Sequence, residues 1–227
     1  MEPTFDLKIY DQLLRFRLFQ GLSRTELLQM AGNTKFGFLK EPPGQTVTTE
    51  GDTCRHLLLL VSGSLSLVRR SDDGGYSFAE SIVAPWNLQI EALFGYQPRY
   101  TATCCTQSEC HFITLSKDEV LRLLDDFLII RLNLLNMLST MAQRRTQQQW
   151  RRSPQSLRER FLRFLTAHAV YPAGPKQLNM LMTRLAAELG DSRLNISLML
   201  NELQRQGLLL LHRGRIEIPS LEKLLQL

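Results

Sequence analysis

The sequence has no long hydrophobic run. Its longest apolar stretches, Leu57–Val61 and Leu208–Leu211, fall far short of the ~18 residues that a membrane-spanning helix needs. The first eight residues carry two acidic side chains and no apolar segment, so we expect no secretory signal peptide. We therefore expect a cytoplasmic protein with no membrane partner, and the hydrophobic content of 44% suffices for a globular core.

Cysteines are few, and their spacing matches no common metal site. The four cysteines follow a C-C-x4-C pattern with one distant residue, which lacks the paired C-x2-C spacing of zinc sites. We interpret them as reduced thiols of the core, and a redox-sensing thiol is the alternative. The cysteines are Cys54, Cys104, Cys105 and Cys110.

Catalytic and metal-binding patterns are also lacking. No Ser/His/Asp set, paired carboxylates or phosphate-binding loop is evident, so we expect a protein that is not an enzyme and has no catalytic residues. A cupin-type metal site needs about three converging His or carboxylate ligands, and the β-rich half offers only His56 and His111. We expect no metal site and no certain cofactor. A cupin-type metalloprotein, or a haem protein with one of these histidines as a ligand, is the alternative.

Acidic and basic residues are distributed unevenly along the chain. Residues 1–126 hold 12 basic and 16 acidic side chains, a net charge of −4, whereas residues 127–227 hold 15 basic and 6 acidic side chains, a net charge of +9. Most of the latter cations are arginines, which suit phosphate. The basic part therefore has the electrostatic footprint of a polyanion partner, and an ordinary solvated surface is the alternative.

Glycine and proline recur regularly between residues 34 and 115 and separate short β-rich segments. Ser71–Gly75 is typical of a hairpin turn, and Ser23–Glu26 forms a capping box at the start of a short N-terminal helix. The pattern predicts an α+β protein whose first domain, residues 1–115, contains a β-sandwich or barrel-like roll. The expected strands are Thr46–Thr49, Leu57–Val61, Ser64–Val68, Tyr76–Val83, Tyr100–Thr106 and Cys110–Leu115.

One long helix is predicted from Lys117 to Arg151, because Ser116 and Glu119 form a capping box and neither Gly nor Pro interrupts it. Apolar residues at alternating steps of three and four predict a coiled-coil seam, which a two-fold homodimer would bury. Packing against the chain's own β domain is the alternative, and both can hold together because Leu132, Leu135 and Leu138 widen the apolar face. We assign residues 116–152 to a dimerisation helix and hinge. The predicted dimer-interface residues are Phe127, Ile130, Leu134, Met137 and Met141.

The last domain, residues 153–227, has the pattern of a winged helix-turn-helix. A helix is expected to start at Ser153-Pro154. Thr183 is expected to cap a helix over Arg184–Leu189, and Ser192 to cap a second helix over Arg193–Gln206 after a left-handed turn at Gly190. The segments Leu208–Leu211 and Ile216–Ile218 predict a hairpin wing with a basic tip at residues 212–214.

The second of these helices predicts binding to double-stranded DNA. Arg193 can bond to guanine or phosphate, and Asn195 to adenine or phosphate. The backbone N–H groups behind Ser192 can receive a phosphate oxygen, and an ordinary helical bundle is the alternative. The predicted DNA-binding residues are Thr183, Arg184, Ser192, Arg193, Asn195, Ser197, Arg213 and Arg215.

The order of these parts resembles the cyclic-AMP receptor protein / fumarate-nitrate regulator (CRP/FNR) superfamily of bacterial transcription regulators, from Leu18 to Ile218. Residues 50–52 and 63–65 resemble its roll signature, residues 141–145 its dimerisation stretch, and residues 182–184, 190–193 and 196 its DNA-binding module. The resemblance implies a cupin-like double-stranded β-roll of the cyclic-nucleotide-binding type that senses an effector. It also implies a homodimer that reads a palindromic site and has RNA polymerase as a further partner.

Several residues depart from the cyclic-nucleotide-binding members. Gln89 and Ile90 stand where those members carry Gly and Glu, and Tyr100 stands where they carry the arginine that pairs with the phosphate. Arg99 is one residue away, which points it to the other face of a strand. A cyclic phosphate buried without a cation is disfavoured, so we expect an unknown small-molecule effector, or none. Cyclic AMP held by Arg99 is the alternative. The effector-pocket candidates are Gln89, Glu91, Arg99, Tyr100 and Thr101.

Two further departures concern the family's other sites. The N-terminal cysteine cluster of iron–sulfur members is absent from the sequence. In the second helix, Leu194 and Leu198 stand where the family has an acid and an arginine that contact bases. We therefore expect the DNA sequence that this protein reads to differ from the family's best-known site.

Overall fold

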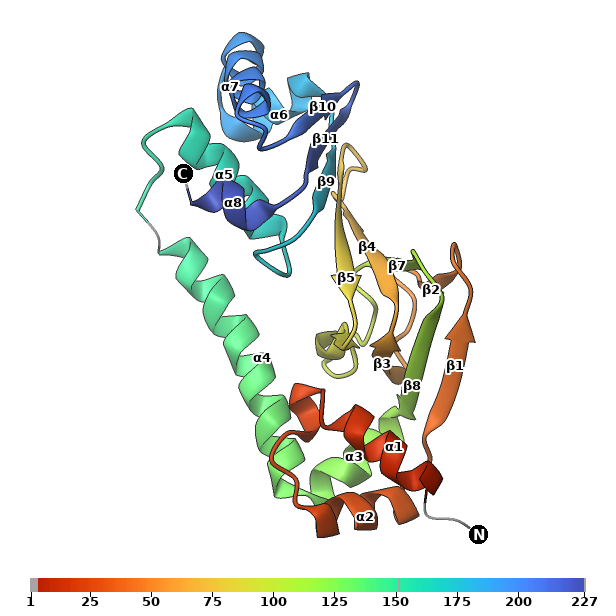
Figure 1. The fold of residues 1–227 in the computed structure, drawn as a ribbon. Coiled ribbons are helices and arrows are strands. Elements are labelled where there is room, and N and C mark those ends of the chain that lie inside the picture. The colour runs from red at the N-terminus through yellow and green to blue at the C-terminus, as the bar shows by residue number, and fades with distance from the viewer. Residues whose placement is uncertain (1–3, 151, 227) are drawn as a thin grey trace. The chain divides into compact units, whose positions relative to one another are not determined.

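The computed structural model describes residues 4–150 and 152–226, which divide into two compact units (Figure 1). The first unit comprises the N-terminal part of the chain up to residue 65 together with residues 82–149. The second comprises residues 66–81 and the chain from residue 150 onward. Residues 66–81 lie within the predicted first domain, yet they pack with the C-terminal part of the chain.

The first unit is built around the antiparallel strand β3 (His56–Ser62). Its residues 57–61 are all buried, which is typical of a strand covered on both faces. The sheet order is β1-β8-β3-β6, and β2 pairs separately with β7. Strands β1 and β6 were not among the expected segments. The other bounds are β1 (Gly37–Glu41), β2 (Thr46–Thr48), β6 (Trp86–Leu88), β7 (Thr103–Thr106) and β8 (Cys110–Ser116).

Helices at both ends of this unit's sequence close its core. The capping box at Ser23 is confirmed, because its hydroxyl accepts the N–H of Glu26 and the Glu26 carboxylate accepts the N–H of Ser23. Leu13, Phe19 and Met30 are fully buried in one core with residues of strands β3 and β8. The helices are α1 (Thr4–Leu13), η1 (Arg17–Phe19), α2 (Arg24–Asn33), η2 (Ile90–Ala92), α3 (Lys117–Asp126) and α4 (Leu128–Gln149).

The expected single helix from Lys117 onward is in fact two helices, so this prediction is wrong. The backbone breaks at Phe127, where φ is −124° and ψ is 102°, and the Phe127 side chain is buried. Two acidic residues end α3, which opposes the helix dipole. Arg131 donates from Nε to the carbonyl oxygen of Leu124 at 2.6 Å, which satisfies a carbonyl that the break leaves open. The expected end, Arg151, lies outside the described residues.

The second unit joins a β-hairpin to the C-terminal domain. Strand β5 (Ser77–Val83) pairs with β9 (Lys176–Asn179), β9 with β11 (Arg215–Ile218), and β11 with β10 (Leu210–His212). The turn between β4 (Ser64–Arg70) and β5 closes with a bond from Ser71 N–H to the Tyr76 carbonyl, as expected for a hairpin. The helices are α5 (Leu157–His168), α6 (Met182–Leu189), α7 (Arg193–Arg205) and α8 (Leu221–Leu225).

Two expected helix starts in this unit are wrong. Helix α5 begins after Ser156, not at Ser153, because the Ser156 hydroxyl accepts the N–H of Glu159 at 3.1 Å. Thr183 does not cap α6, which begins one residue before it and has Leu181 at the N-cap without a side-chain bond. The strand pairing of β9 continues to Met180, whose N–H donates to the Gly214 carbonyl, so the helix starts directly after it.

Candidate nucleic-acid interface

Helices α6 and α7 are joined by the short turn at Gly190 and Asp191. Gly190 has φ +61°, a left-handed conformation that favours glycine, and the N–H of Asp191 donates to the Ala186 carbonyl at 3.0 Å. The Asp191 carboxylate accepts Asn195 Nδ2 at 2.7 Å and Ser192 N–H at 2.8 Å, and it pairs with Arg160 of α5. These contacts lower the pKa of Asp191, so its charged form holds the turn and α5 together.

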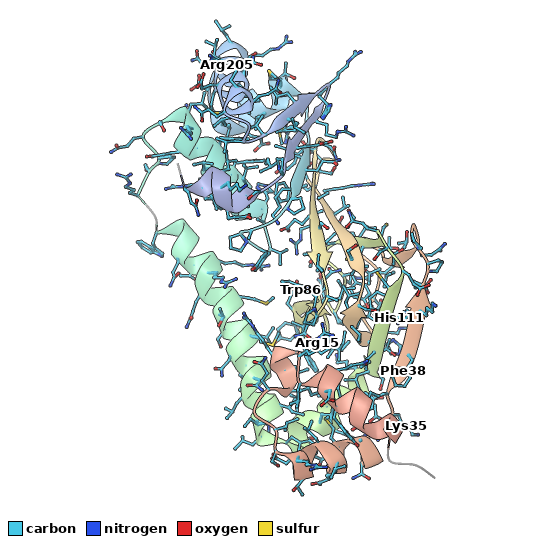
Figure 2. All side chains as sticks on the ribbon, viewed as in Figure 1. Arg15, Lys35, Phe38, Trp86, His111 and Arg205 are labelled. Atoms are coloured by element: carbon cyan, nitrogen blue, oxygen red, sulfur yellow. The ribbon has the colours of Figure 1, made fainter. Side chains whose placement is uncertain are left out.

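Helix α7 has a clear division between its buried and exposed faces. Ile196, Leu200 and Leu203 are buried in the core of the second unit. The opposite face is an exposed stripe at steps of four, three and four residues, in line along the helix. This outer stripe consists of Leu194, Leu198, Asn201 and Arg205, and Arg205 projects from the helix in Figure 2.

The predicted DNA-binding residues of α7 differ in how they are presented. Ser192 caps the helix as predicted, since its hydroxyl accepts the N–H of Asn195 at 3.1 Å. Arg193 is exposed in the first turn beside the outer stripe. The Asn195 amide is engaged with Asp191, and half-buried Ser197 accepts Asn201 Nδ2 at 3.3 Å. Arg193 is therefore presented for contact, whereas Asn195 stabilises the turn.

Arg184, one of the predicted DNA-binding residues, is held by two carboxylates. Its guanidinium lies 2.8 Å from Asp73 of the β4–β5 turn and 2.8 Å from Glu188. It also lies over the ring of Tyr76, 5.8 Å from the centroid. Thr183, in the preceding position, is exposed. A phosphate group would have to replace Asp73 in order to meet Arg184 in the same way.

The predicted wing is the β10–β11 hairpin, which lies beside α6 and α7 (Figure 1). Arg213 at its tip is exposed, and Gly214 adopts φ +71° in the turn. Arg215 is also exposed and pairs with Glu217 at 3.0 Å. The wing therefore presents two further guanidinium groups on the same unit as α7.

Gln89 occupies the interior of the β-roll. It is buried, with φ +44°, and its Oε1 accepts the N–H groups of Thr101 at 2.8 Å and Ala102 at 2.9 Å. Its Nε2 donates to the Ala102 carbonyl at 3.0 Å and to Thr48 Oγ1 at 3.2 Å. The side chain thus satisfies backbone groups that would otherwise be free to bind a ligand.

The other effector-pocket candidates do not gather around Gln89. Arg99 is exposed and donates to the Gly51 carbonyl at 2.7 Å. Tyr100 packs against the core, where burial raises the pKa of its hydroxyl, and that hydroxyl lies 3.5 Å from the His56 carbonyl. Glu91 is half-buried. The structure brings Gln89 and Thr101 together, but it holds the one arginine of the set at the surface.

The histidines and cysteines of the roll are placed separately. His111 points outward from β8 and lies 3.2 Å from Glu109 (Figure 2), and His56 is exposed at the start of β3. The four cysteines are free thiols, and Cys105 alone among them is not buried. Within residues 4–150 and 152–226, no group of three His, Cys, Asp or Glu side chains is placed to hold a metal ion.

The predicted dimer seam on α4 lies in the core of its own unit. Phe127, Ile130 and Leu134 are buried there, and Met137 and Met141 are half-buried against it. Phe127, Ile130 and Leu134 therefore have partners within the chain, as in the packing alternative, and the half-buried Met137 and Met141 keep part of their surface for a second subunit. Asn133 Nδ2 fixes the helix further by donating to the carbonyls of Leu18 and Gln20 at 3.1 and 2.8 Å.

Another face of α4 remains exposed. Leu128, Leu132 and Leu135 are 64%, 47% and 53% exposed and recur at steps of four and three residues. Ser139 and Ala142 continue the same steps with small, exposed side chains. The three leucines and these two small residues form a second seam, which we call the outer α4 face. Even with these leucines, no helix in the part of the chain that the structure describes is long and apolar enough to span a membrane.

Comparisons with known proteins match both units. A family model for the cyclic nucleotide-binding domain matches residues 39–127, and a model for the Crp-like helix-turn-helix domain matches residues 159–227. A search of curated protein sequences gives no match.

Three solved structures share the fold at low sequence identity. The catabolite activator protein of Thermus thermophilus is 21% identical, with 93% of this chain and 97% of that chain covered and a TM-score of 0.54. The c-di-GMP-responsive regulator CLP of Xanthomonas campestris is 18% identical (85% and 97% covered, TM-score 0.51). The sensor domain of the transcriptional regulator DNR from Pseudomonas aeruginosa is 22% identical (66% and 99% covered, TM-score 0.54). With a cyclic nucleotide-binding domain followed by a Crp-like helix-turn-helix over more than half of its length, the chain belongs to the CRP/FNR family of transcription regulators.

Proposed function

We propose that the protein is a homodimeric regulator that reads a palindromic DNA site under the control of a signal other than cyclic AMP. The observation that carries the proposal is the arrangement of α7. Its outer stripe is exposed, its N-terminus is capped by Ser192, and the exposed guanidinium groups of Arg193, Arg213 and Arg215 belong to the same unit. Arginine side chains and a helix N-terminus both suit phosphate oxygens.

The outer α4 face supplies the dimer contact in this proposal. Three exposed leucines in line on one helix are unfavourable in water, and a second copy of the same helix would cover them around a two-fold axis. The small residues Ser139 and Ala142 allow the two helices to approach closely. A two-fold dimer presents two copies of α7, which would enter major grooves about one helical turn (~34 Å) apart. We also propose RNA polymerase as a further partner, and membership of the family is the only ground for this partner.

Control by cyclic AMP is disfavoured by the interior of the roll. Gln89 fills hydrogen-bonding positions there, and Arg99 donates outward to the Gly51 carbonyl. A buried phosphate would lack a cation. The similar fold of a c-di-GMP-responsive regulator supports the view that the fold does not dictate the ligand. The signal, if a small molecule, has a chemistry other than that of cyclic AMP.

A calorimetric titration with cyclic AMP checks this part of the proposal. We expect no heat beyond that of dilution at nucleotide concentrations up to about 1 mM. Any binding would then have a dissociation constant above about 1 mM, which corresponds to a binding free energy weaker than roughly 4 kcal/mol. Saturable binding in the micromolar range that is lost in Arg99→Ala would instead establish the alternative in which Arg99 holds the phosphate.

Binding to duplex DNA as a function of salt tests the proposed function itself. With about six phosphate contacts per dimer, the association constant should fall by roughly 10³-fold between 50 and 200 mM salt. Arg213→Ala, in both subunits, should reduce the slope of log K against log salt by about two, one for each phosphate that the variant no longer binds. If the protein binds no duplex DNA at 50 mM salt, the proposed function is wrong.

Asp73 and Arg184 provide a further prediction. Asp73→Asn keeps the oxygen that accepts the Ser71 hydroxyl and the Gly75 N–H, but it removes the charge that pairs with Arg184. The guanidinium then keeps only Glu188 as a charged partner and can meet a phosphate in the place of Asp73, so we expect DNA affinity at 50 mM salt to rise by about fivefold. Gel-shift or anisotropy titrations measure the change.

Asp72→Asn is the matched control, because it removes the same charge from the same turn and the Asp72 carboxylate accepts only the Asp73 N–H among the described contacts. We expect its effect to stay below about twofold. Equal effects of the two substitutions would show that general charge, and not release of Arg184, changes the affinity.

A further inference from the structure

Two large apolar side chains lie at the centre of the proposed DNA-contacting surface. Leu194 is 68% exposed and Leu198 is 60% exposed, and they are adjacent on the outer stripe of α7. Two polar side chains next to them in sequence are engaged elsewhere, since Asn195 bonds to Asp191 and Ser197 accepts from Asn201. The exposed stripe of α7 is therefore apolar in the part nearest to the helix N-terminus.

The surroundings of the two leucines identify the kind of partner that covers them. Arg193 lies beside them, Arg205 ends the same stripe, and the wing arginines belong to the same unit. A small apolar patch with Arg193 and the helix N-terminus at one end of its stripe and Arg205 at the other complements a surface that is polyanionic at its edges and apolar at its centre. The major groove of DNA is such a surface where thymine is present, because the C5-methyl group of thymine is the apolar group on the base edges.

From this we infer that Leu194 and Leu198 each contact a thymine methyl group, so that every half-site contains at least two T·A pairs read by apolar contact. This inference rests on the proposed function and names part of the DNA sequence that it requires. Four residues advance about 6 Å along a helix, and base pairs are ~3.4 Å apart. The two thymines should therefore lie within about two base-pair steps of one another, on either strand.

The same contacts would discriminate against the other bases. A leucine placed against the amino group of cytosine or the O6 and N7 atoms of guanine covers a polar group without bonding to it, which is unfavourable. Leu194 and Leu198 would thus select thymine both by attraction and by exclusion. Arg193, at the edge of the stripe, is left to bond to a guanine or to a phosphate.

The experiment replaces single thymines by uracil, which keeps base pairing and removes only the methyl group. A binding site for the full-length protein is first selected from random 30-base-pair duplexes. Each thymine of one half-site is then changed to uracil, in both half-sites together, and affinities are measured at one salt concentration. We expect two positions per half-site at which affinity falls by about fourfold per methyl group, the effect of removing one buried methyl group.

Leu194→Ala and Leu198→Ala connect these positions to the side chains. Each variant should bind the thymine and uracil duplexes equally well at one of the two positions and keep the discrimination at the other. Leu28→Ala is the matched control, because Leu28 is 54% exposed on α2 of the first unit, and it should keep the discrimination at both positions. Because all three leucines are exposed, the midpoint temperature of thermal unfolding should be nearly the same in each variant as in the original protein.

The outcomes separate this inference from the proposed function. If a specific duplex is selected but uracil is as good as thymine at every position, the leucines do not read methyl groups and the inference is wrong, while the proposed function stands. If the alanine variants weaken binding equally to all duplexes and leave the discrimination intact, the inference is likewise wrong. If no duplex is enriched, the proposed function fails and the inference fails with it.

Discussion

Replacing Glu80 by glutamine should lower the free energy of unfolding of the second unit by about 3–5 kcal/mol. The Glu80 and Lys176 side chains are 1% and 0% exposed, and Oε1 lies 3.1 Å from Nζ. The same carboxylate accepts the N–H groups of Val170 at 2.8 Å and Tyr171 at 3.3 Å. Glutamine keeps the shape of the side chain but leaves the Lys176 ammonium buried without its counter-charge.

This loss would be a large share of the total, since the free energy of unfolding of a natural domain is only about 5–15 kcal/mol. Glu80 lies on β5 of the hairpin and Lys176 on β9 of the C-terminal domain, so the pair joins the two segments that make up the second unit. Urea unfolding, followed by circular dichroism, measures the change. A cost below about 1 kcal/mol, as for an exposed ion pair, would show that the pair does not hold the hairpin in place.

Lys176→Met provides the matched control in a double-mutant cycle. Methionine has a similar length and no charge, so the double variant Glu80→Gln, Lys176→Met buries neither charge. It should recover a large part of the stability that Glu80→Gln loses. Equal losses in the single and double variants would indicate that the bonds from Glu80 to the Val170 and Tyr171 backbone, and not the ion pair, stabilise the contact.

Introducing charge on the outer α4 face should abolish the dimer. Leu132→Glu with Leu135→Glu places two carboxylates per subunit at the proposed two-fold contact, where they would be buried together. Sedimentation equilibrium should show a monomer with an unchanged far-ultraviolet spectrum. DNA affinity should fall by roughly 10²–10⁴-fold, because the second half-site no longer binds as part of the same molecule.

Ile130→Ala provides the contrast. Ile130 is fully buried in the core of its own unit, so this change should cost about 2–5 kcal/mol of stability and leave the association constant of the folded dimer nearly unchanged. If Ile130→Ala dissociates the dimer while the paired glutamates do not, the seam that faces the second subunit is the one first expected from the sequence, and the outer α4 face is not the interface.

The helix pattern of α4 shows how far the sequence alone can lead. It correctly indicates a helix with an apolar seam, but α4 carries two such seams, one through Ile130 and Leu134 and one through Leu132 and Leu135. Periodicity cannot distinguish them, because both consist of aliphatic residues at steps of three and four. The choice depends on long-range packing against η1 and on bonds such as that from Asn133 to the Leu18 carbonyl.

Local signals predicted other elements well. The capping box at Ser23, the hairpin turn after Ser71 and the left-handed turn at Gly190 are confirmed, because each depends on residues close together in the sequence. The short strands β1, β6 and β9 were missed, since their pairing partners lie far along the chain. The attachment of residues 66–81 to the C-terminal part of the chain was missed for the same reason, because it depends on the pairing of β5 with the distant strand β9.

The sequence predicted which residues lie near the candidate site better than it predicted what each of them contacts. Ser192 and Arg193 lie at the capped and exposed start of α7, as expected. Asn195 and Arg184 also lie near that surface, but Asp191 and Asp73 engage them. These acidic partners could not be assigned from the sequence, because the partner of a long polar side chain depends on which backbone segments the fold brings near.

Sequence-specific DNA binding is tested most directly by the ratio of two affinities at one salt concentration. One duplex carries the selected palindromic site, and the other has the same base composition in scrambled order. At physiological salt we expect the palindrome to bind at least 10³-fold more tightly. A ratio near one would contradict the account, since charge alone would then explain all of the binding.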